Sequence, residues 1–463
     1  MRTKKKYDVA IVGGGVAGIF AGYELTKQRP DLRVILLEQG EEIGRRSCPI
    51  IEKKSPSCIQ CKSCAIMRGF GGAGAFSDGK FNFTTQLGGW LTDYLSADEV
   101  MALIQYVDEV NLHFGATEKF FSTSTPQADV IRRKAISYDL HLMDAKCKHL
   151  GTERNREILT KQAKWLEEHL ELTCNSRVDD IVRLPDSRYL LETAVGDVEA
   201  DYVIAAPGRS GAEWFSKQCA SLDLPMINNQ VDLGVRVELP AIIFREITDA
   251  MHEAKLMYRT KQYKDVVRTF CMNPYGYVVT ENTDGILTVN GHSYTDPALQ
   301  SENTNFALLV SNRFTTPFNE PYQYGKRIAS LSNMLGGGII VQRFGDLADG
   351  RRTNAHRIPQ SFVKPTLEAT PGDLSLVLPK RHLDNVIEMI HVLDKIAPGT
   401  ANQDTLLYGV EVKFYSSRLQ LSRELETKYT NLFAIGDGAG VTRGLSQAGA
   451  SGVTAARAIL SRT

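Results

Sequence analysis

The first forty residues contain the feature that most restricts how this chain can fold. An apolar run over residues 7–12 ends at Gly13, and two further glycines complete the spacing GxGxxG at Gly15 and Gly18. A helical pattern follows, and then a second apolar run that ends at Glu38. In a strand–turn–helix–strand unit of this kind, the glycines permit a tight turn, close approach of a pyrophosphate and close packing of helix on strand. The stretch therefore predicts a dinucleotide-binding unit.

The same unit predicts which residues hold the dinucleotide. The start of the helix offers backbone N–H groups and the positive end of the helix dipole to the phosphates. Glu38, at the end of the second strand, is placed to accept hydrogen bonds from a ribose. The residues expected at this end of the ligand are Gly13, Gly15, Val16, Ala17, Gly18, Glu38 and Gln39.

Length and charge limit the class of protein. A chain of 463 residues is long enough for two or three domains, each with its own core. Lysine plus arginine and aspartate plus glutamate both number 54, so the net charge is zero. This balance gives no electrostatic reason to expect nucleic acid or an anionic membrane as a partner, and we expect a small-molecule substrate. The sequence leaves the oligomeric state open.

The basic start of the chain resembles a targeting signal only at first sight. Arg2 and the lysines at 4–6 precede an apolar run, as they would in a secretory signal. Asp8 and the three glycines interrupt that run, so we reject the signal interpretation. No run approaches the roughly eighteen apolar residues that cross a membrane. We therefore expect a cytoplasmic protein.

A second glycine-rich stretch covers residues 68–80. Its small residues allow close approach of a ligand, and two phenylalanines and two alanines give it apolar content that a solvated linker lacks. We therefore prefer a loop that lines a ligand over a flexible surface loop. The residues expected at the cofactor are Gly72, Ala73 and Gly74.

The chain after this loop has a helical pattern. Apolar spacing, for example at Leu140 and Leu150, predicts helices over residues 97–114 and 129–170. The basic run at 132–134 could hold an anionic substrate, but such runs are more often the solvated face of a helix, which is the interpretation that we prefer.

Two later strand–turn patterns are compatible with the same ligand. Residues 201–206 form an apolar strand that ends near Gly208, and residues 431–435 form another that leads into Asp437 and a closing helix. Asp437 can accept hydrogen bonds from a polyol while the helix N-terminus faces an electron-rich ring edge. The alternative is an ordinary strand–helix connection with a capping aspartate. The cofactor-binding residues expected from these turns are Ala206, Gly208, Gly436, Asp437, Gly444 and Ala448.

Between these turns the pattern changes to shorter strands with polar insertions, over residues 212–398. This region is the expected substrate domain. His292 and Tyr294 lie at a strand end and are candidates for moving a proton, although each is more often structural when taken alone. The candidates for holding a carboxylate or stabilising negative charge are Arg236, Arg343 and Lys413.

The order of the three glycine turns resembles that of flavoproteins of the glutathione-reductase-like, two-dinucleotide-binding class. The resemblance implies FAD, with the first turn on the pyrophosphate, Glu38 on the adenosine ribose and Asp437 on the ribityl and phosphate region. A closer similarity, nearly end to end, is to a bacterial family of uncharacterised FAD-dependent dehydrogenases. Its residues here are 71–80, 234–238, 342–346 and 411–414. That family implies flavin chemistry and a glycine-rich loop near the flavin, with no settled substrate.

We therefore predict an α/β fold. It combines a Rossmann-like FAD-binding domain, three-layered and with a mostly parallel sheet, and an inserted α+β substrate domain. The FAD-binding domain is expected to comprise residues 1–211 and 399–463, with a helical insert at about 97–170. The substrate domain is expected to comprise residues 212–398.

Four of the eight cysteines, Cys48, Cys58, Cys61 and Cys64, fall within seventeen residues. Four thiolates at this spacing suit zinc or an iron–sulfur cluster, and the spacing alone does not choose between them. The competing interpretation is free thiols or a redox disulfide in an intracellular loop. The spacing does not match the pair separated by four residues that is expected of flavin disulfide reductases.

The leading functional hypothesis is an FAD-dependent oxidoreductase, a dehydrogenase or ene-type reductase that acts on a small organic molecule. No second GxGxxG lies between the glycine turns, which argues against a dedicated NAD(P)H domain. Electrons would come from the substrate, from transiently bound NAD(P)H, or from an electron-donor protein through the cysteine cluster. The alternatives are an FAD-dependent monooxygenase and a non-enzymatic flavin-binding redox sensor or RNA-modification partner.

Overall fold

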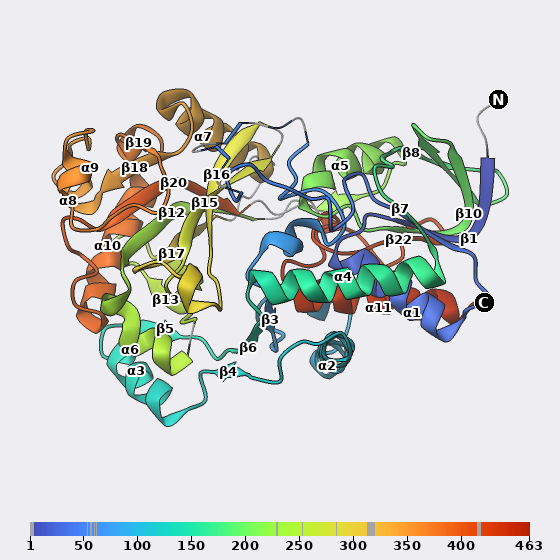
Figure 1. The fold of residues 1–463 in the computed structure, drawn as a ribbon, viewed down its shortest axis with the longest axis horizontal. Coiled ribbons are helices and arrows are strands. Elements are labelled where there is room, and N and C mark those ends of the chain that lie inside the picture. The colour runs from blue at the N-terminus through green and yellow to red at the C-terminus, as the bar shows by residue number, and fades with distance from the viewer. Residues whose placement is uncertain are drawn as a thin grey trace.

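The helices and strands form two parts, each built on its own sheet (Figure 1). The first part contains both ends of the chain and lies at the right of Figure 1, and the second part lies at the left. The structure is a computed structural model that describes residues 4–52, 54–55, 58–59, 61, 63–227, 230–251, 253–283, 285–312, 320–413 and 418–463.

The first part has a seven-stranded sheet in the order β7-β2-β1-β10-β9-β8, with β22 also paired to β10. The pairs that involve β1, β2, β7 and β22 are parallel, while β9 pairs antiparallel with both β10 and β8. The central strands are almost entirely buried, as expected where helices or further strands cover both faces of a parallel sheet. The strands are β1 (Lys4–Val12), β2 (Val34–Leu37), β7 (Glu171–Thr173), β8 (Val178–Arg183), β9 (Tyr189–Thr193), β10 (Asp197–Ala205) and β22 (Leu432–Ala434).

Helices cover this sheet, and four of them gather on one side of it in Figure 1. They are α1 (Val16–Gln28), α2 (Ala97–His113), α4 (Thr152–His169) and α11 (Leu445–Leu460), with α5 (Ala212–Ser221) on the other side. The first and last helices of the chain pack so closely that a Cβ at Gly452 would lie 2.2 Å from the Ala17 carbonyl oxygen. The two chain ends therefore build one layer.

The second part has an eight-stranded sheet in the order β19-β18-β20-β12-β17-β14-β13-β5. All neighbours in it are antiparallel except β18 and β19. The two central strands, β12 (Val231–Pro240) and β17 (Asn303–Asn312), pair over their full length. The other strands are β5 (Leu140–Leu142), β13 (Leu256–Arg259), β14 (Val266–Asn273), β18 (Ile340–Arg343), β19 (Thr370–Pro371) and β20 (Leu406–Lys413).

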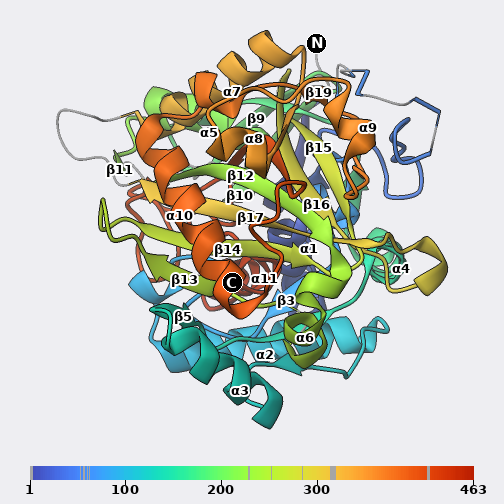
Figure 2. The same ribbon diagram turned by 90° about the vertical axis from the view of Figure 1, so that its left-hand side faces the viewer.

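The long helix α10 (Lys380–Ile396) lies across this sheet over β12 and β17 (Figure 2). Its buried side includes Leu383, Val386, Ile390 and Leu393, a spacing that places all four on one helical face. A separate hairpin of β15 (Tyr277–Thr283) and β16 (Ile286–His292) stands between the two parts in Figure 1. The remaining helices here are α3 (Pro126–Ile136), α6 (Ala241–Met251), α7 (Pro321–Gly336), α8 (Phe344–Ala348) and α9 (Arg357–Gln360).

Short elements connect these parts. Three of them form a small sheet in the order β3-β6-β4. The strands of this small sheet are β3 (Lys80–Asn82), β4 (Phe121–Ser122) and β6 (Lys146–His149). Two further short strands are β11 (Met226–Ile227) and β21 (Arg418–Leu419). The 3-10 helices are η1 (Gly72–Phe76), η2 (Leu91–Asp93), η3 (Arg209–Gly211), η4 (Pro297–Leu299) and η5 (Leu374–Leu376).

The predicted fold class is confirmed, but the division of the chain differs from the prediction in two places. Residues 137–151, where helical spacing predicted a helix, contain β5 and β6 instead. Leu140 and Leu142 are both buried, which is the period-2 pattern of a strand, and short apolar runs do not distinguish the two periods. Strand β20 lies beyond residue 398 and yet pairs with β12, so it belongs to the second sheet.

Among the described residues, no helix combines the length and the apolarity needed to cross a membrane.

Candidate functional site

The unit formed by the β1–α1 turn and the start of α1 has room only for glycine at positions 13 and 18. Gly13 has a φ of +111°, and a Cβ there would lie 2.1 Å from the carbonyl oxygen of Ala206, directly after β10. A Cβ at Gly18 would lie 2.0 Å from the Gly13 carbonyl oxygen. Helix α1 begins after Gly15 with no side chain capping its first N–H groups. These donors, at the carboxyl edge of the parallel strands, suit an anion such as a pyrophosphate.

Glu38 closes this turn from the end of β2. The side chain is buried, and Oε2 accepts a hydrogen bond from the backbone N–H of Gly14 at 2.8 Å. Oε1 accepts bonds from the N–H groups of Gly40 and Gly69, each at 2.9 Å. A carboxylate offers about four lone-pair positions, so about one remains for the predicted ribose contact. Through these hydrogen bonds, Glu38 also connects the N-terminal glycine turn to the second glycine-rich stretch.

The glycine-rich stretch lies directly on the fingerprint. The N–H of Gly71 donates to the Gly14 carbonyl oxygen at 2.8 Å, and a Cβ at Gly72 would lie 3.2 Å from the Cα of Gly15. A Cβ at Gly74 would lie 3.0 Å from Leu445, in the first turn of α11. The glycine-rich stretch therefore packs between the N-terminal glycine turn and the first turn of α11. Ala73 lies within η1.

The turn after β22 meets the turn after β10. Gly436 has a φ of +76°, and a Cβ at Gly438 would lie 2.2 Å from the Gly208 carbonyl oxygen. Between these glycines, Asp437 Oδ2 lies 3.3 Å from Nε of Arg209. Burial works against the charge of Arg209, but Asp437 and Glu281 outweigh it and raise the pKa of the guanidinium.

Buried polar atoms without partners gather at this turn. Asp437 Oδ1, Thr442 Oγ1 and Ser446 Oγ are buried and have no hydrogen-bond partner among the described residues. Helix α11 begins after Gly444, again with no side-chain cap, and Ala448 lies in its first turn. Unpaired acceptors, hydroxyls and N–H groups in one short segment fit the hydroxyl and phosphate groups of a dinucleotide such as FAD.

The structure therefore brings together the three predicted groups of cofactor-binding residues. Gln39 joins them from the end of β2, where its Nε2 donates to Ser210 Oγ at 3.4 Å. Val16 and Ala17 open α1, beside Gly74 and Gly436 respectively. Their contacts with a ligand stay predictions.

Arg236 and Lys413, two of the predicted anion-holding residues, meet at one buried carboxylate. Arg236 donates to Glu411 through Nε at 2.7 Å and Nη2 at 2.9 Å, and Lys413 Nζ lies 2.8 Å from Glu411 Oε1. Arg236 also donates to Asn305 Oδ1 at 2.8 Å. All three charged side chains are nearly inaccessible to solvent. Side chains of neighbouring strands, Glu411 on β20 and Asn305 on β17, thus accept hydrogen bonds from the guanidinium. These contacts favour a structural role for Arg236.

A chain of polar contacts runs from this group to Asp437. Arg236 donates to Asn290 Oδ1 at 3.2 Å, and Asn290 donates to Glu281 Oε1 at 2.5 Å. Glu281 Oε2 lies 3.7 Å from Arg209, which pairs with Asp437. Burial opposes the charge of Glu281, but Lys413 and Arg209 outweigh it and lower its pKa.

The sequence analysis missed Arg209, Glu281 and Asn290, three members of this chain of contacts. Arg209 directly follows Gly208, so its place in the turn was the one available signal.

His292 and Tyr294 lie together at the end of β16. Their ring centroids are 4.8 Å apart, and Tyr277 on β15 completes a cluster of three rings. Burial lowers the pKa of His292 to about 4, against an opposing effect of Asp78, so the imidazole is neutral at pH 7. Its Nδ1 is buried without a partner among the described residues. Burial also raises the pKa of Tyr294.

The segment after η1 provides a second group of buried charges. Lys80 Nζ donates to the Met272 carbonyl oxygen at 2.6 Å and lies 3.0 Å from Asp78 and 3.5 Å from Glu253. Although burial opposes its charge, Asp78 and Glu253 raise the pKa of Lys80. Lys80 therefore links β3 to β14 of the second sheet.

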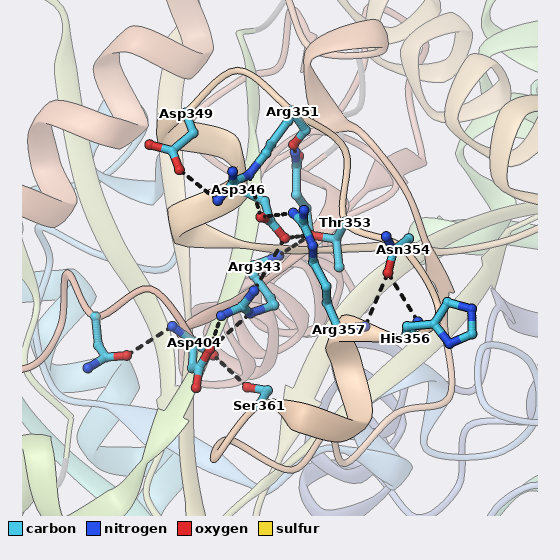
Figure 3. A network of polar contacts seen from close by, with 12 residues as sticks. Arg343, Asp346, Asp349, Arg351, Thr353, Asn354, His356, Arg357, Ser361 and Asp404 are labelled. Atoms are coloured by element: carbon cyan, nitrogen blue, oxygen red, sulfur yellow. Dashed lines mark hydrogen bonds and ion pairs between the residues drawn. The ribbon is translucent and has the colours of Figure 1, made fainter.

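Arg343, the remaining anion-holding candidate, lies elsewhere. It donates through Nε to Asp404 at 2.9 Å and lies 3.6 Å from the buried Asp346 (Figure 3). Arg351 and Arg357 contact the same aspartate beside α8 and α9, at the far end of the second part from the glycine turns (Figures 1 and 3). The structure does not bring Arg343 to the candidate site.

The predicted metal site is not formed by the described residues. Among them, no three His, Cys, Asp or Glu side chains are arranged to hold a metal ion, although Cys48, Cys58, Cys61 and Cys64 are all described. Cys61 is exposed, while Cys58 packs on the β15–β16 hairpin, where Asn282 donates to its Sγ at 3.9 Å. Burial, together with the thiols of Cys48 and Cys58, raises the pKa of Cys64. Residues 53, 56, 57, 60 and 62 of this loop lie outside the described residues.

The fold and the geometry define a protein with a Rossmann-like dinucleotide-binding part joined to a second, mainly antiparallel part. Residues 11–53 match the family described as "NAD(P)-binding Rossmann-like domain". Residues 230–414 match the family described as "FAD-dependent protein, C-terminal domain-like". These two matches support an FAD-dependent oxidoreductase as the class. The finer assignment to the glutathione-reductase-like class stays a prediction.

Individual proteins are also similar to this chain, either at low sequence identity or over a short segment. An uncharacterised protein of Clostridium beijerinckii is 25% identical over 479 residues, covering 98% of this chain and 80% of the relative. L-2-hydroxyglutarate dehydrogenase of Dictyostelium discoideum is 52% identical over 71 residues, which cover 13% of this chain and 16% of that protein. Among solved structures, glycine oxidase from Geobacillus kaustophilus matches with 13% identity and a TM-score of 0.39, covering 99% of this chain and 95% of that one.

Proposed function

We propose that this protein is an FAD-dependent dehydrogenase or ene-type reductase that acts on a small organic molecule. The observation that carries the proposal is the meeting of glycine turns from both ends of the chain at one edge of the first sheet. There, Asp437 Oδ1 is buried and has no hydrogen-bond partner among the described residues, and no described side chain caps the N-termini of α1 and α11. A ligand that needs both phosphate donors and a polyol acceptor fits this set.

The residues that would hold FAD follow from this arrangement. The N–H groups at the start of α1 would bind the pyrophosphate, Asp437 would accept hydrogen bonds from the ribityl chain, and Glu38 would retain one position for the ribose. FAD, when bound, supplies hydride or single-electron transfer. An NAD-only protein has no use for a return of the C-terminal turn onto the same ligand.

The residues between the two parts would orient the substrate and handle its proton. His292 is neutral at pH 7 because burial lowers its pKa to about 4. Its Nδ1, which has no hydrogen-bond partner among the described residues, can therefore exchange a proton with a substrate. Arg236 is already paired with the buried Glu411, so it would hold β12 and β20 together and would not contact the substrate. The source of electrons, whether substrate, NAD(P)H or an electron-donor protein, stays a prediction.

The test is an FAD titration of the apoprotein, followed by anaerobic reduction with NADPH, NADH or dithionite. Asp437→Asn removes one charge at the proposed ribityl contact, and Asp223→Asn is the control because Asp223 is exposed. We expect Asp437→Asn to weaken FAD binding by about tenfold to a hundredfold, since hydrogen bonds to charged groups contribute about 1.5–3 kcal/mol. Equal FAD affinity in both variants would contradict the assignment of Asp437. Rapid, substrate-linked oxygen incorporation by the reduced protein would indicate a monooxygenase instead.

A further inference from the structure

One carboxylate near the proposed flavin site has no hydrogen-bond partner among the residues that the structure describes. Both side-chain oxygens of Glu153, in the first turn of α4, are buried and have no hydrogen-bond partner among the described residues. The hydroxyl of the preceding Thr152 is in the same state. A buried carboxylate without donors is costly, so this arrangement is stable only if another group supplies them.

A cluster of aromatic rings, which includes Tyr294, lies near this carboxylate. A Cβ at Gly151 would lie 3.2 Å from Glu153 Oε2 and 2.7 Å from Thr295, the residue after Tyr294. Glu153 is close enough to Tyr294 to raise its pKa, in addition to the effect of burial. Tyr294 in turn contacts the rings of His292, at 4.8 Å, and Tyr277, at 6.0 Å. The carboxylate therefore lies near the residues that follow the β15–β16 hairpin.

The position is next to the glycine-rich stretch. Asn155, two residues after Glu153, donates through Nδ2 to the Gly74 carbonyl oxygen at 2.7 Å. The N–H of Gly151 donates to the Asp78 carbonyl oxygen at 3.0 Å. The start of α4 is thus fixed to both ends of the segment that is expected to line the flavin.

Among the residues that the structure describes, no ion pair includes Glu153. By contrast, Asp78 lies 3.0 Å from Lys80 and 3.6 Å from His149, and Glu253 lies 3.5 Å from Lys80. A buried carboxylate without a cation of its own favours a cationic ligand.

We propose that Glu153, Thr152 and the rings of Tyr277, His292 and Tyr294 form a subsite for the cationic nitrogen of an organic amine, which is the substrate class. The inference rests on the proposed flavin function. An ammonium group carries up to three N–H donors, which match two carboxylate oxygens and one hydroxyl. The rings add an apolar wall and attraction between the cation and their π electrons.

The test uses the FAD-loaded protein and two probes of similar shape, benzylammonium chloride and benzyl alcohol. Binding is measured by calorimetry and by the change in the flavin absorbance spectrum. Glu153→Gln removes the charge and keeps the side-chain size. Glu157→Gln is the matched control, because Glu157 is one turn further along α4 and exposed. Tyr294→Leu tests the ring contribution independently.

Benzylammonium is expected to bind at least tenfold more tightly than benzyl alcohol. Glu153→Gln should weaken its binding by about tenfold to a hundredfold, and Tyr294→Leu by a smaller factor, while Glu157→Gln should bind like the parent protein. Equal binding of the two probes, or equal benzylammonium binding by Glu153→Gln, would overturn the proposal. The FAD content of each sample separates the two failures: a flavin-loaded protein without amine binding contradicts only this subsite, and a protein that does not take up FAD contradicts the proposed function.

Discussion

Arg209 connects the two parts of the molecule at the proposed flavin site. It lies between Asp437, at the proposed flavin site, and Glu281, on the hairpin of the second part. Replacing Arg209 by Gln leaves Asp437 without its ion-pair partner and removes one of the two cations, Lys413 and Arg209, that act on Glu281. We expect FAD affinity to fall by about tenfold or more, because a charged group left unpaired in a protein interior costs at least about 1–3 kcal/mol. Titration of the apoprotein with FAD measures this.

Two further variants interpret that result. Arg209→Lys should restore part of the affinity by restoring the charge, and Arg245→Gln, at an exposed position on α6, should change nothing. An unchanged dissociation constant in Arg209→Gln would show that Asp437 does not depend on its ion pair.

His292 makes stability depend on pH in a defined direction. Its pKa is about 4 in the folded protein and about 6.5 when exposed, so the unfolded chain binds the proton more readily. Its contribution to stability is therefore fully present above about pH 6.5 and falls as the pH decreases to about 4, by up to about 3 kcal/mol.

Urea unfolding at neutral pH and at pH about 5 measures this loss in the parent protein and in His292→Asn. His382, whose pKa burial also lowers to about 4, is present in both proteins and cancels. An equal loss of stability in the two proteins on acidification would contradict the assigned titration of His292.

Single residues show what a sequence can predict about this site. Gly13, Glu38 and Asp437 could be found because each belongs to a local pattern of strand, turn and helix. Arg236 could be found but not interpreted, because Glu411, which binds it, lies 175 residues away in the chain. Glu281 and Asn290 gave no local signal, since their roles arise from contacts between strands and across the two parts.

At the scale of elements, the β1–α1 unit has no space for a side chain at Gly13 or Gly18. A methyl group at Gly18 would lie 2.0 Å from the Gly13 carbonyl oxygen and so would separate α1 from β1. Gly18→Ala is therefore expected to abolish FAD retention during purification. Gly44→Ala is the control, because nothing lies within 4 Å of a Cβ at that position. Full FAD occupancy in Gly18→Ala would show that the turn is not the binding element.

The central strands of the second sheet depend on a buried ion pair. Arg236 on β12 and Glu411 on β20 are both fully buried, and removing one partner of such a pair typically destabilises a protein by about 3–5 kcal/mol. Arg236→Gln should lower the denaturant midpoint accordingly, whereas the exposed Arg245→Gln should not. A stability equal to that of the parent protein would show that the pair contributes nothing to the sheet.

Elements also show where sequence patterns fail. The N-terminal strand–helix–strand unit was predictable because its periodicity is long and its glycines are spaced for one purpose. The strands β5 and β6 were missed because three or four residues carry too little periodicity to distinguish strand from helix. The sheet to which β20 belongs is decided by pairing with β12, whose paired residues lie 168 or more positions away in the chain.

At the scale of the whole molecule, both ends of the chain and both sheets meet at one proposed ligand. The first and last helices form one layer, and the polar chain from Asp437 to Arg236 continues from that layer into the second sheet. FAD binding should therefore stabilise both parts together. Calorimetric unfolding is expected to show one transition that moves to higher temperature with added FAD. A transition that moves while a second one stays fixed would indicate that the parts are not coupled.

The visible absorbance spectrum of the gently purified protein, with the FAD-to-protein ratio from the extracted cofactor, tests the central claim most directly. A flavin held jointly by the turns at Gly13 and Asp437 predicts flavin bands and about one FAD per chain. A colourless protein that gains no flavin spectrum when FAD is added would contradict it.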